Sequence, residues 1–202
     1  MEKSFEVNSF LTHDEVTILL KVYSVLPKAL NHGSAMDKKA YTTGFDLDDL
    51  DKTPLKNFKN RLKDLLGPHQ VTVSMFLEEF SPWTVHSDYH KGDNKPYYAL
   101  LFPLDYENKD THTIIFNELG TEKDYKEKLS EESGYHYDQK QLKLLSHVDQ
   151  PLLKKLSIDK IYKWQKGTMI AWHRDLLHCS DNFLLDGPQT KTALVLFLNR
   201  DD

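Results

Sequence analysis

Residues 166–183 read KGTMIAWHRDLLHCSDNF, and residues 190–200 read TKTALVLFLNR. The first segment opens with a Lys-Gly turn signal and continues into an apolar run that predicts a strand. A loop carrying His178 follows, and a Gly-Pro turn then leads into a second predicted strand near Lys191. Short strands joined by loops that hold polar side chains are typical of β-sandwiches and jelly rolls.

The same pattern of short apolar runs is found in the sequence before this segment. Runs rich in β-branched, aromatic and other apolar residues predict strands over 71–80, 97–104, 112–118, 161–164, 168–172 and 190–199. The turn-like Asn108-Lys-Asp sequence lies between the second and third of these runs, and it predicts that they form a hairpin.

Two helices are predicted before the strands. Thr12-His-Asp-Glu15 is a capping box, and apolar residues at helical spacing follow it as far as Pro27. A second helix is predicted from Thr53, with proline in its first turn, to the Gly67-Pro68 stop. Residues 31–51 read as loop or short irregular structure, and residues 121–160 read as a polar, partly helical insertion.

These elements predict an α+β chain built around a jelly-roll core. We expect a single domain over 1–202, with helical support in 1–67, the jelly-roll core in 71–200 and the insertion at 121–160.

The amino-acid composition argues against several classes of protein. With 39% hydrophobic and 28% charged residues in 202, the chain suits a soluble globular protein. No apolar run follows the N-terminal residues, and none approaches the roughly 18 residues of a membrane span, so neither a secretory signal nor a membrane segment is expected. The single cysteine, Cys179, excludes an internal disulfide and Cys-based zinc modules and favours the cytoplasm. The net charge of −5 disfavours general nucleic-acid binding.

Three His-x-Asp pairs are candidates for part of a metal site, namely His86/Asp88, His147/Asp149 and His173/Asp175. The first pair follows a strong predicted strand, and residues i and i+2 of an extended chain point to the same side. No strand leads into His147/Asp149, which lies in the polar insertion, and Asp175 of the third pair would share one short loop with His178. One cation can therefore meet both side chains of the first pair. With His178, 178 − 88 = 90 residues further on, they supply the two imidazoles and one carboxylate of a non-haem Fe(II) site.

Taken together, these segments resemble the Fe(II)- and 2-oxoglutarate-dependent oxygenases, most closely the prolyl-4-hydroxylase-like branch and its small microbial and phage relatives. The resemblance runs from about Val71 to Arg200 and rests on an HxD pair, a long gap, a distal histidine and a basic residue on the next strand. It implies a double-stranded β-helix, a jelly-roll variant. It also implies that His86, Asp88 and His178 bind iron and carry the catalysis.

The resemblance assigns further roles to residues around that trio. Lys191, at 191 − 178 = 13 residues after the distal histidine, matches the base that binds the distal carboxylate of 2-oxoglutarate. Tyr97 or Tyr98 is expected to bond the same co-substrate, and strand alternation favours only one of them, for which we choose Tyr97. Trp83 and Trp172 are candidates for lining a substrate pocket.

The implied reaction uses Fe(II), 2-oxoglutarate and O2, and it hydroxylates an unactivated C–H bond with release of succinate and CO2. Asp88 supplies a carboxylate where related halogenases have a small residue, so hydroxylation is the expected outcome. The expected substrate is a prolyl residue or a small amino acid or metabolite. The alternative is a non-catalytic, cupin-like jelly roll that binds a metal or ligand, and the oligomeric state stays open.

Overall fold

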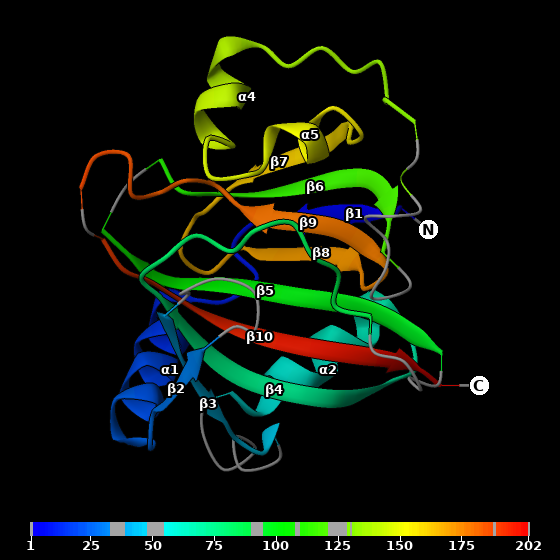
Figure 1. The fold of residues 1–202 in the computed structure, drawn as a ribbon. Helices are drawn as coiled ribbons and strands as arrows, with labels where there is room; N and C mark the ends of the chain where they lie inside the picture. The colour runs from blue at the N-terminus through cyan, green and yellow to red at the C-terminus, as the bar shows by residue number, and fades with distance from the viewer. Residues whose placement is uncertain are drawn as a thin grey trace.

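The computed structural model describes residues 2–32, 39–47, 55–89, 95–107, 110–120, 129, 131–187 and 189–201. Within these ranges, antiparallel strands form two sheets that face each other (Figure 1). The larger sheet has the order β1-β8-β5-β10-β4-β3-β2 and contains Ser4–Val7 (β1), Met169–His173 (β8), Pro96–Tyr106 (β5), Lys191–Arg200 (β10), His69–Glu79 (β4), Lys39–Gly44 (β3) and Ala29–His32 (β2). The smaller sheet has the order β7-β6-β9 and contains Ile158–Lys163 (β7), His112–Leu119 (β6) and Leu176–Ser180 (β9).

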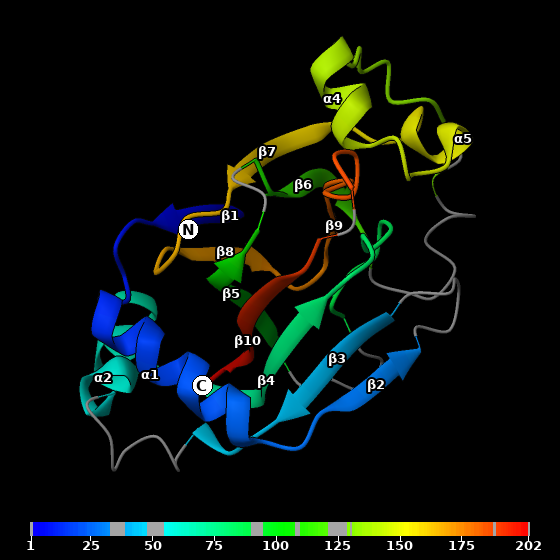
Figure 2. The same ribbon diagram turned by 90° about the vertical axis from the view of Figure 1, so that its left-hand side faces the viewer.

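Two N-terminal helices cover the outer face of the larger sheet (Figure 2). They are α1, His13–Val25, and α2, Lys56–Leu66. Both present buried apolar side chains to outward-facing residues of the central strands, and this cluster includes Leu19, Phe58, Leu62, Leu100, Phe102, Leu194 and Leu196. Burial of this apolar area is what holds the helices on the sheet.

Local sequence signals set the ends of these helices. The capping box expected at Thr12 is present, because its hydroxyl accepts from the Glu15 N–H at 3.2 Å and the Glu15 carboxylate accepts from the Thr12 N–H at 2.8 Å. Helix α2 ends at Gly67, whose φ of 75° lies in the left-handed region that glycine tolerates best. The expected start of this helix at Thr53 lies outside the described residues.

The segment between β6 and β7 covers the smaller sheet. Its described part contains α4, Gln139–Leu144, and α5, Gln150–Leu153, which sit above β6 and β7 in Figure 1. Their leucines pack on the outward side chains Ile114, Phe116 and Leu177 of β6 and β9. The predicted insertion is therefore partly helical, and it supplies an apolar cover for one face of the core.

A third apolar cluster lies between the two sheets. It joins inward residues of the larger sheet, such as Leu101, Trp172 and Val195, to Ile115 and Trp164 from the side of the smaller sheet. The structure thus has the jelly-roll core with N-terminal supporting helices that the sequence predicted. No helix in the described ranges is long and apolar enough to cross a membrane.

Three local predictions were wrong. Strands β5 and β6 do not form a hairpin, because β5 pairs with β8 and β10 whereas β6 pairs with β7 and β9. Residues 108 and 109 of the turn signal lie outside the described residues, but β5 belongs to the larger sheet and β6 to the smaller one. Residues 31–51 were expected to be irregular, but their described part contributes to the β2–β3 hairpin. His178 lies within strand β9 and not in a loop.

Candidate metal centre and its cavity

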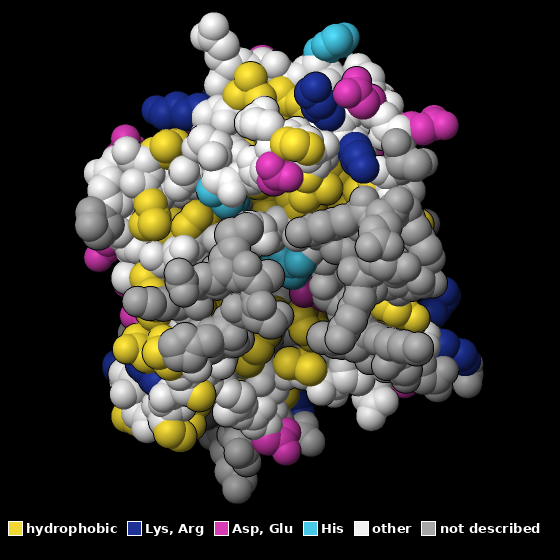
Figure 3. All heavy atoms as spheres, in the orientation of Figure 1, with side chains coloured by type: hydrophobic (Ala, Val, Ile, Leu, Met, Phe, Trp, Pro, Cys, Tyr) yellow, Lys and Arg dark blue, Asp and Glu magenta, His cyan; other side chains and the backbone are white. Residues whose placement is uncertain are grey.

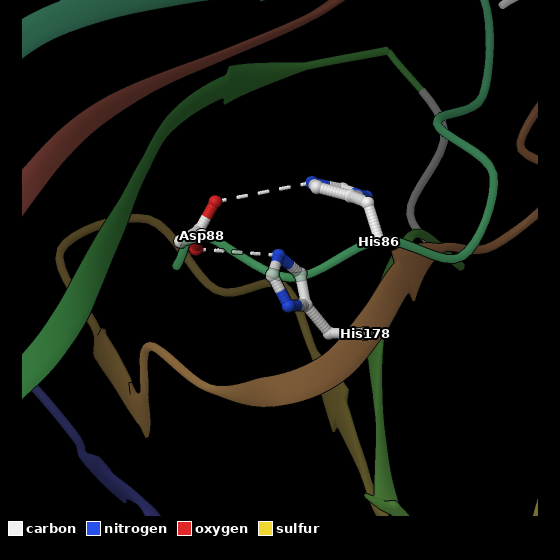
Figure 4. A group of neighbouring side chains, drawn as sticks. All are labelled: His86, Asp88 and His178. Carbon is white, nitrogen blue, oxygen red and sulfur yellow. Dashed lines mark ion pairs between the residues drawn. The ribbon is translucent and has the colours of Figure 1, made fainter. Parts of the chain in front are cut away.

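Two segments far apart in the sequence bring His86, Asp88 and His178 together. His86 and Asp88 lie on the irregular segment that follows β4, and His178 lies in β9 (Figure 4). The backbones of the two histidines form an isolated antiparallel bridge. The N–H of His86 donates to the carbonyl of His178 at 3.0 Å, and the N–H of His178 donates back at 2.9 Å. This bridge holds the two imidazoles side by side, with ring centroids 4.3 Å apart.

Each imidazole is oriented by a carbonyl two residues earlier in the chain. The Nδ1 of His86 lies 2.8 Å from the Thr84 carbonyl oxygen, and the Nδ1 of His178 lies 3.0 Å from the Leu176 carbonyl oxygen. Because a carbonyl only accepts, these contacts place the proton on Nδ1 in both rings. In both histidines the Nε2 lone pair is therefore the one available to a metal ion.

Both Nε2 atoms face the carboxylate of Asp88. The distances are 3.3 Å from His178 Nε2 to Oδ2 and 3.9 Å from His86 Nε2 to Oδ1. Desolvation in its buried position lowers the pKa of His178 to about 4, so this ring is neutral at neutral pH. Two imidazole lone pairs and a carboxylate, with donor atoms all within 4.8 Å of one another, form an arrangement that suits a divalent cation.

Strand β8 and the turn after it fix Asp88. The indole Nε1–H of Trp172 donates to Asp88 Oδ2 at 3.2 Å. The guanidinium of the buried Arg174 donates to the Asp88 carbonyl through Nε at 3.2 Å and Nη2 at 2.9 Å, and the Asp88 N–H donates to the Arg174 carbonyl at 3.0 Å. Contacts of this kind orient ligating carboxylates and tune metal affinity.

The segment that carries His86 and Asp88 is anchored from the other side as well. The Ser87 hydroxyl donates to the carbonyl of Gly120, at the end of β6. A side chain at Gly120 would require its neighbours to shift, since a Cβ there would lie 2.5 Å from Leu177 Cδ2 and 3.0 Å from Ser87 Cβ. The Trp83 carbonyl contacts His147 Nε2 at 3.1 Å, so the insertion also holds this segment.

A cavity of about 300 Å³ opens beside the three residues, between the two sheets. Its wall is mostly apolar, and in the space-filling view a histidine and hydrophobic side chains are visible near the centre of the face seen in Figure 1 (Figure 3). Described residues that line it include Thr42, Met75, Leu77, Glu79, Trp83, Leu101, Thr113, Trp172, Lys191, Val195 and Phe197. A mostly apolar pocket with a few convergent polar groups is the usual form of a small-molecule site.

Lys191 provides the positive charge of this cavity. It is the only lysine or arginine among the described lining residues, and its side chain is only 1% exposed. Its Nζ lies 3.2 Å from Glu79 Oε2 and 4.3 Å from the centre of the Trp164 ring. The Trp164 indole N–H in turn donates to the Thr113 hydroxyl at 2.9 Å, which leaves the Thr113 proton available to another acceptor.

The fold matches solved structures over nearly the whole chain. A 2OG-Fe(II) oxygenase family oxidoreductase from Burkholderia pseudomallei gives a TM-score of 0.64 at 10% identity, covering 98% of this chain and 86% of that one. A prolyl-4-hydroxylase from Pseudomonas putida gives 0.57 at 10% identity, with 99% and 94% covered. The viral collagen prolyl hydroxylase of Paramecium Bursaria Chlorella virus-1, solved with 2OG, gives 0.51 at 16% identity, with 99% and 97% covered. No protein-family model matches the sequence, and no curated protein matches it.

The chain has the double-stranded β-helix fold of the 2-oxoglutarate- and iron(II)-dependent oxygenases. In this double-stranded β-helix the predicted trio is gathered at one cavity, and Lys191 lines the same cavity. Trp83 and Trp172 also line it, as expected for pocket residues. The sequence analysis did not identify Glu79, Thr113 or Arg174 as residues of the site. Only Glu79 could have been found from the sequence, because it alternates with Met75 and Leu77 on the inward face of β4.

Tyr97 is not brought to the cavity. Its hydroxyl donates to the carbonyl of Leu66 at the end of α2, at 3.1 Å, and its ring belongs to the core beneath the helices. The Tyr98 hydroxyl donates to the Glu2 carbonyl at 2.8 Å, so it is not directed to the cavity either. Desolvation raises the pKa of Tyr97, as expected for a buried phenol.

The two other His-x-Asp pairs have different surroundings. His147 contacts the Trp83 backbone and so supports the first pair from outside. The His173 ring packs on Tyr98 with centroids 4.6 Å apart, and desolvation lowers its pKa. Among the described residues, only the trio with His86 forms a group of three donors able to hold a metal ion.

Proposed function

We propose that this protein is an Fe(II)- and 2-oxoglutarate-dependent oxygenase, with His86, Asp88 and His178 as the catalytic iron ligands. The observation that carries the proposal is the convergence of two Nε2 atoms and one carboxylate, all donor atoms lying within 4.8 Å, at a cavity of this fold. Such a set occupies one face of an octahedral ion and leaves positions open for a co-substrate and O2.

Several residues that line the cavity have separate roles in the proposed reaction. The bound iron would supply the oxidative chemistry that converts 2-oxoglutarate to succinate and CO2 and hydroxylates a C–H bond. Lys191 binds the distal carboxylate of 2-oxoglutarate as a point charge. Trp172 holds the Asp88 carboxylate, and the apolar wall of Leu101, Val195 and Phe197 keeps bulk water from the reacting atoms.

The substrate is proposed to be a prolyl residue or a small amino acid or metabolite. The prolyl hydroxylases among the matched structures support this choice, and the modest cavity of about 300 Å³ suits a small group. Asp88 keeps a carboxylate at the metal, which favours hydroxylation as the outcome. We further propose that the chain acts as one domain in a reducing compartment such as the cytoplasm, in keeping with its single cysteine, the buried Cys179.

The test uses the purified protein and its His178→Ala and Asp88→Ala variants. Under anaerobic conditions, Fe(II) and 2-oxoglutarate should together produce a visible charge-transfer absorption in the unmodified protein and none in either variant. Under air, a panel of amino acids and proline-containing peptides should include one that stimulates succinate release. His136→Ala removes an exposed histidine of the insertion and is the matched control.

Two results would contradict the proposal. Full retention of the absorption and of turnover in His178→Ala would exclude this histidine as an iron ligand. Metal binding without any 2-oxoglutarate binding would favour the alternative, a non-catalytic jelly-roll protein that binds a metal or another ligand.

A further inference from the structure

Trp164 lies behind the wall of the cavity, next to the residue proposed to bind the distal carboxylate. It directly follows β7, and its backbone N–H donates to the Thr111 carbonyl at 2.8 Å. The residue is buried in the apolar cluster between the two sheets. It is not among the described residues that line the cavity, yet its indole contacts Lys191 and Thr113, which do line it. Any effect of Trp164 on a bound ligand therefore passes through these residues.

The first contact of the indole is with Lys191. Its Nζ lies 4.3 Å from the centre of the Trp164 ring, within the range of cation–π attraction. Lysine carries its charge at the end of a flexible stem, so the position of the ammonium depends on the groups that pack against it. The Phe183 ring lies 4.8 Å from the same atom, and Glu79 Oε2 lies 3.2 Å from it. Together these contacts hold the ammonium at one place in the cavity wall.

The second contact of the indole is with Thr113 on β6. The Trp164 Nε1–H donates to the Thr113 hydroxyl oxygen at 2.9 Å. An indole nitrogen donates and does not accept, so the hydroxyl proton of Thr113 cannot point to Trp164. The contact therefore sets Thr113 to act as a donor to a ligand in the cavity.

One rigid ring thus contacts both an ammonium and a hydroxyl of the same cavity. Because both contacts go to the same indole, Lys191 and Thr113 are held at the same end of the cavity. Donors that are fixed in advance lose less conformational entropy when a ligand binds, which increases affinity.

We propose that Trp164 is a positioning residue for the co-substrate, because it fixes the Lys191 ammonium and the Thr113 hydroxyl where the distal carboxylate of 2-oxoglutarate binds. The inference rests on the proposed function, since it concerns the affinity of the same cavity for its 2-oxo acid. Loss of the indole weakens a ligand that has a distal carboxylate and leaves a ligand with an apolar tail unaffected.

The experiment compares two 2-oxo acids of equal carbon number on the Mn²⁺-loaded protein. Titration calorimetry measures the Kd of 2-oxoglutarate and of 2-oxopentanoate, whose tail ends in a methyl group. In the unmodified protein, 2-oxoglutarate should bind at least about tenfold more tightly. Trp164→Phe keeps an aromatic ring but removes the N–H, and it should weaken 2-oxoglutarate by about three- to tenfold, the effect of one lost hydrogen bond. The Kd of 2-oxopentanoate should change by less than about twofold.

Thr113→Val tests the path through the hydroxyl. It keeps the size of the side chain, and it should weaken 2-oxoglutarate by a factor similar to that of Trp164→Phe. The double variant should be little weaker than either single variant, because no hydroxyl remains for the indole to orient. Fully additive losses would overturn the inference, and so would an unchanged 2-oxoglutarate affinity in Thr113→Val, which can be measured even if Trp164→Phe fails to fold.

Tyr162→Phe is the matched control. It also removes a buried hydrogen bond from an aromatic residue of the smaller sheet, but the Tyr162 hydroxyl donates to Ser4 of β1, at 3.0 Å. Both Kd values should stay unchanged in this variant. Equal weakening of both 2-oxo acids in Trp164→Phe, or an equal loss of 2-oxoglutarate affinity in Tyr162→Phe, would reveal a general loosening of the core and overturn the inference. These results leave the proposed function standing, whereas an unmodified, metal-loaded protein that binds neither 2-oxo acid overturns both.

Discussion

A histidine can bind a metal through either ring nitrogen, and at both candidate ligand positions the chain selects the same one. The carbonyl oxygens of Thr84 and Leu176, each two residues before its histidine, accept a hydrogen bond from Nδ1. The Nε2 atom of each ring then faces Asp88. The spacing of the trio predicted which residues would meet. It did not predict the tautomer, because that depends on a backbone conformation which only the assembled β9 bridge fixes.

The indole of Trp172 gives the first prediction. Trp172→Phe keeps an aromatic ring but removes the donor to Asp88 Oδ2, so the carboxylate is less well oriented. We expect Mn²⁺ or Fe(II) affinity to fall by about 10- to 100-fold, as is typical when such a supporting contact is lost. Titration calorimetry measures this change. Trp164→Phe removes a buried indole that does not contact Asp88 and should keep normal metal affinity; equal losses in both variants would argue against the role of Trp172.

At the scale of elements, the segment after β4 must pack closely against the end of β6. A Cβ on Gly120 would lie 2.5 Å from Leu177 Cδ2 and 3.0 Å from Ser87 Cβ. Gly120→Ala should therefore push these segments apart, lower the free energy of unfolding by about 1–3 kcal/mol and weaken metal binding. Denaturant unfolding and metal titration test both effects. Gly44→Ala, whose Cβ would meet only the Ser74 carbonyl at 4.0 Å, should change neither.

The pair between β10 and β4 gives a prediction about stability. Lys191→Ala breaks the buried ion pair by removing the ammonium group 3.2 Å from the Glu79 carboxylate, which should lower the free energy of unfolding by about 3–5 kcal/mol. It should also raise the 2-oxoglutarate concentration required, because the variant lacks the lysine proposed to bind the distal carboxylate. The double change Lys191→Met with Glu79→Leu should recover much of the stability, measured by denaturant unfolding, but not the 2-oxoglutarate binding. No recovery would mean that the pair contributes net stability.

The elements also show where sequence reasoning reaches its limit. The helix at Thr12 and the strands β4, β5, β8 and β10 carry local signals, namely a cap and long apolar runs, and they were predicted well. The β5–β6 hairpin was wrong because a turn signal does not tell whether a chain returns within one sheet or crosses to another. Glu79 was missed for a similar reason, since its partner is set by long-range register.

On the scale of the whole molecule, the candidate ligands link parts of the chain that meet only when it is folded. His178 belongs to the smaller sheet, Asp88 is held by Trp172 and Arg174 from the side of the larger one, and His147 of the insertion supports the segment of His86. The two sheets and the insertion, whose arrangement Figure 1 shows, therefore all contribute contacts to one site. In the unfolded chain these donor atoms are not held close together, so a metal ion should bind the native state almost exclusively.

Because the metal ion should bind only the folded protein, its effect on thermal stability reports whether the site is assembled. A ligand that binds only the folded state stabilises it by about 2.7 kcal/mol at a hundredfold excess over its Kd. Mn²⁺ should therefore raise the Tm of the protein by several degrees, and a chelator should reverse the shift. His178→Ala should abolish the shift, whereas His136→Ala, in the exposed part of the insertion, should keep it. A shift of the same size in His178→Ala would mean that the stabilising ion binds elsewhere in the molecule.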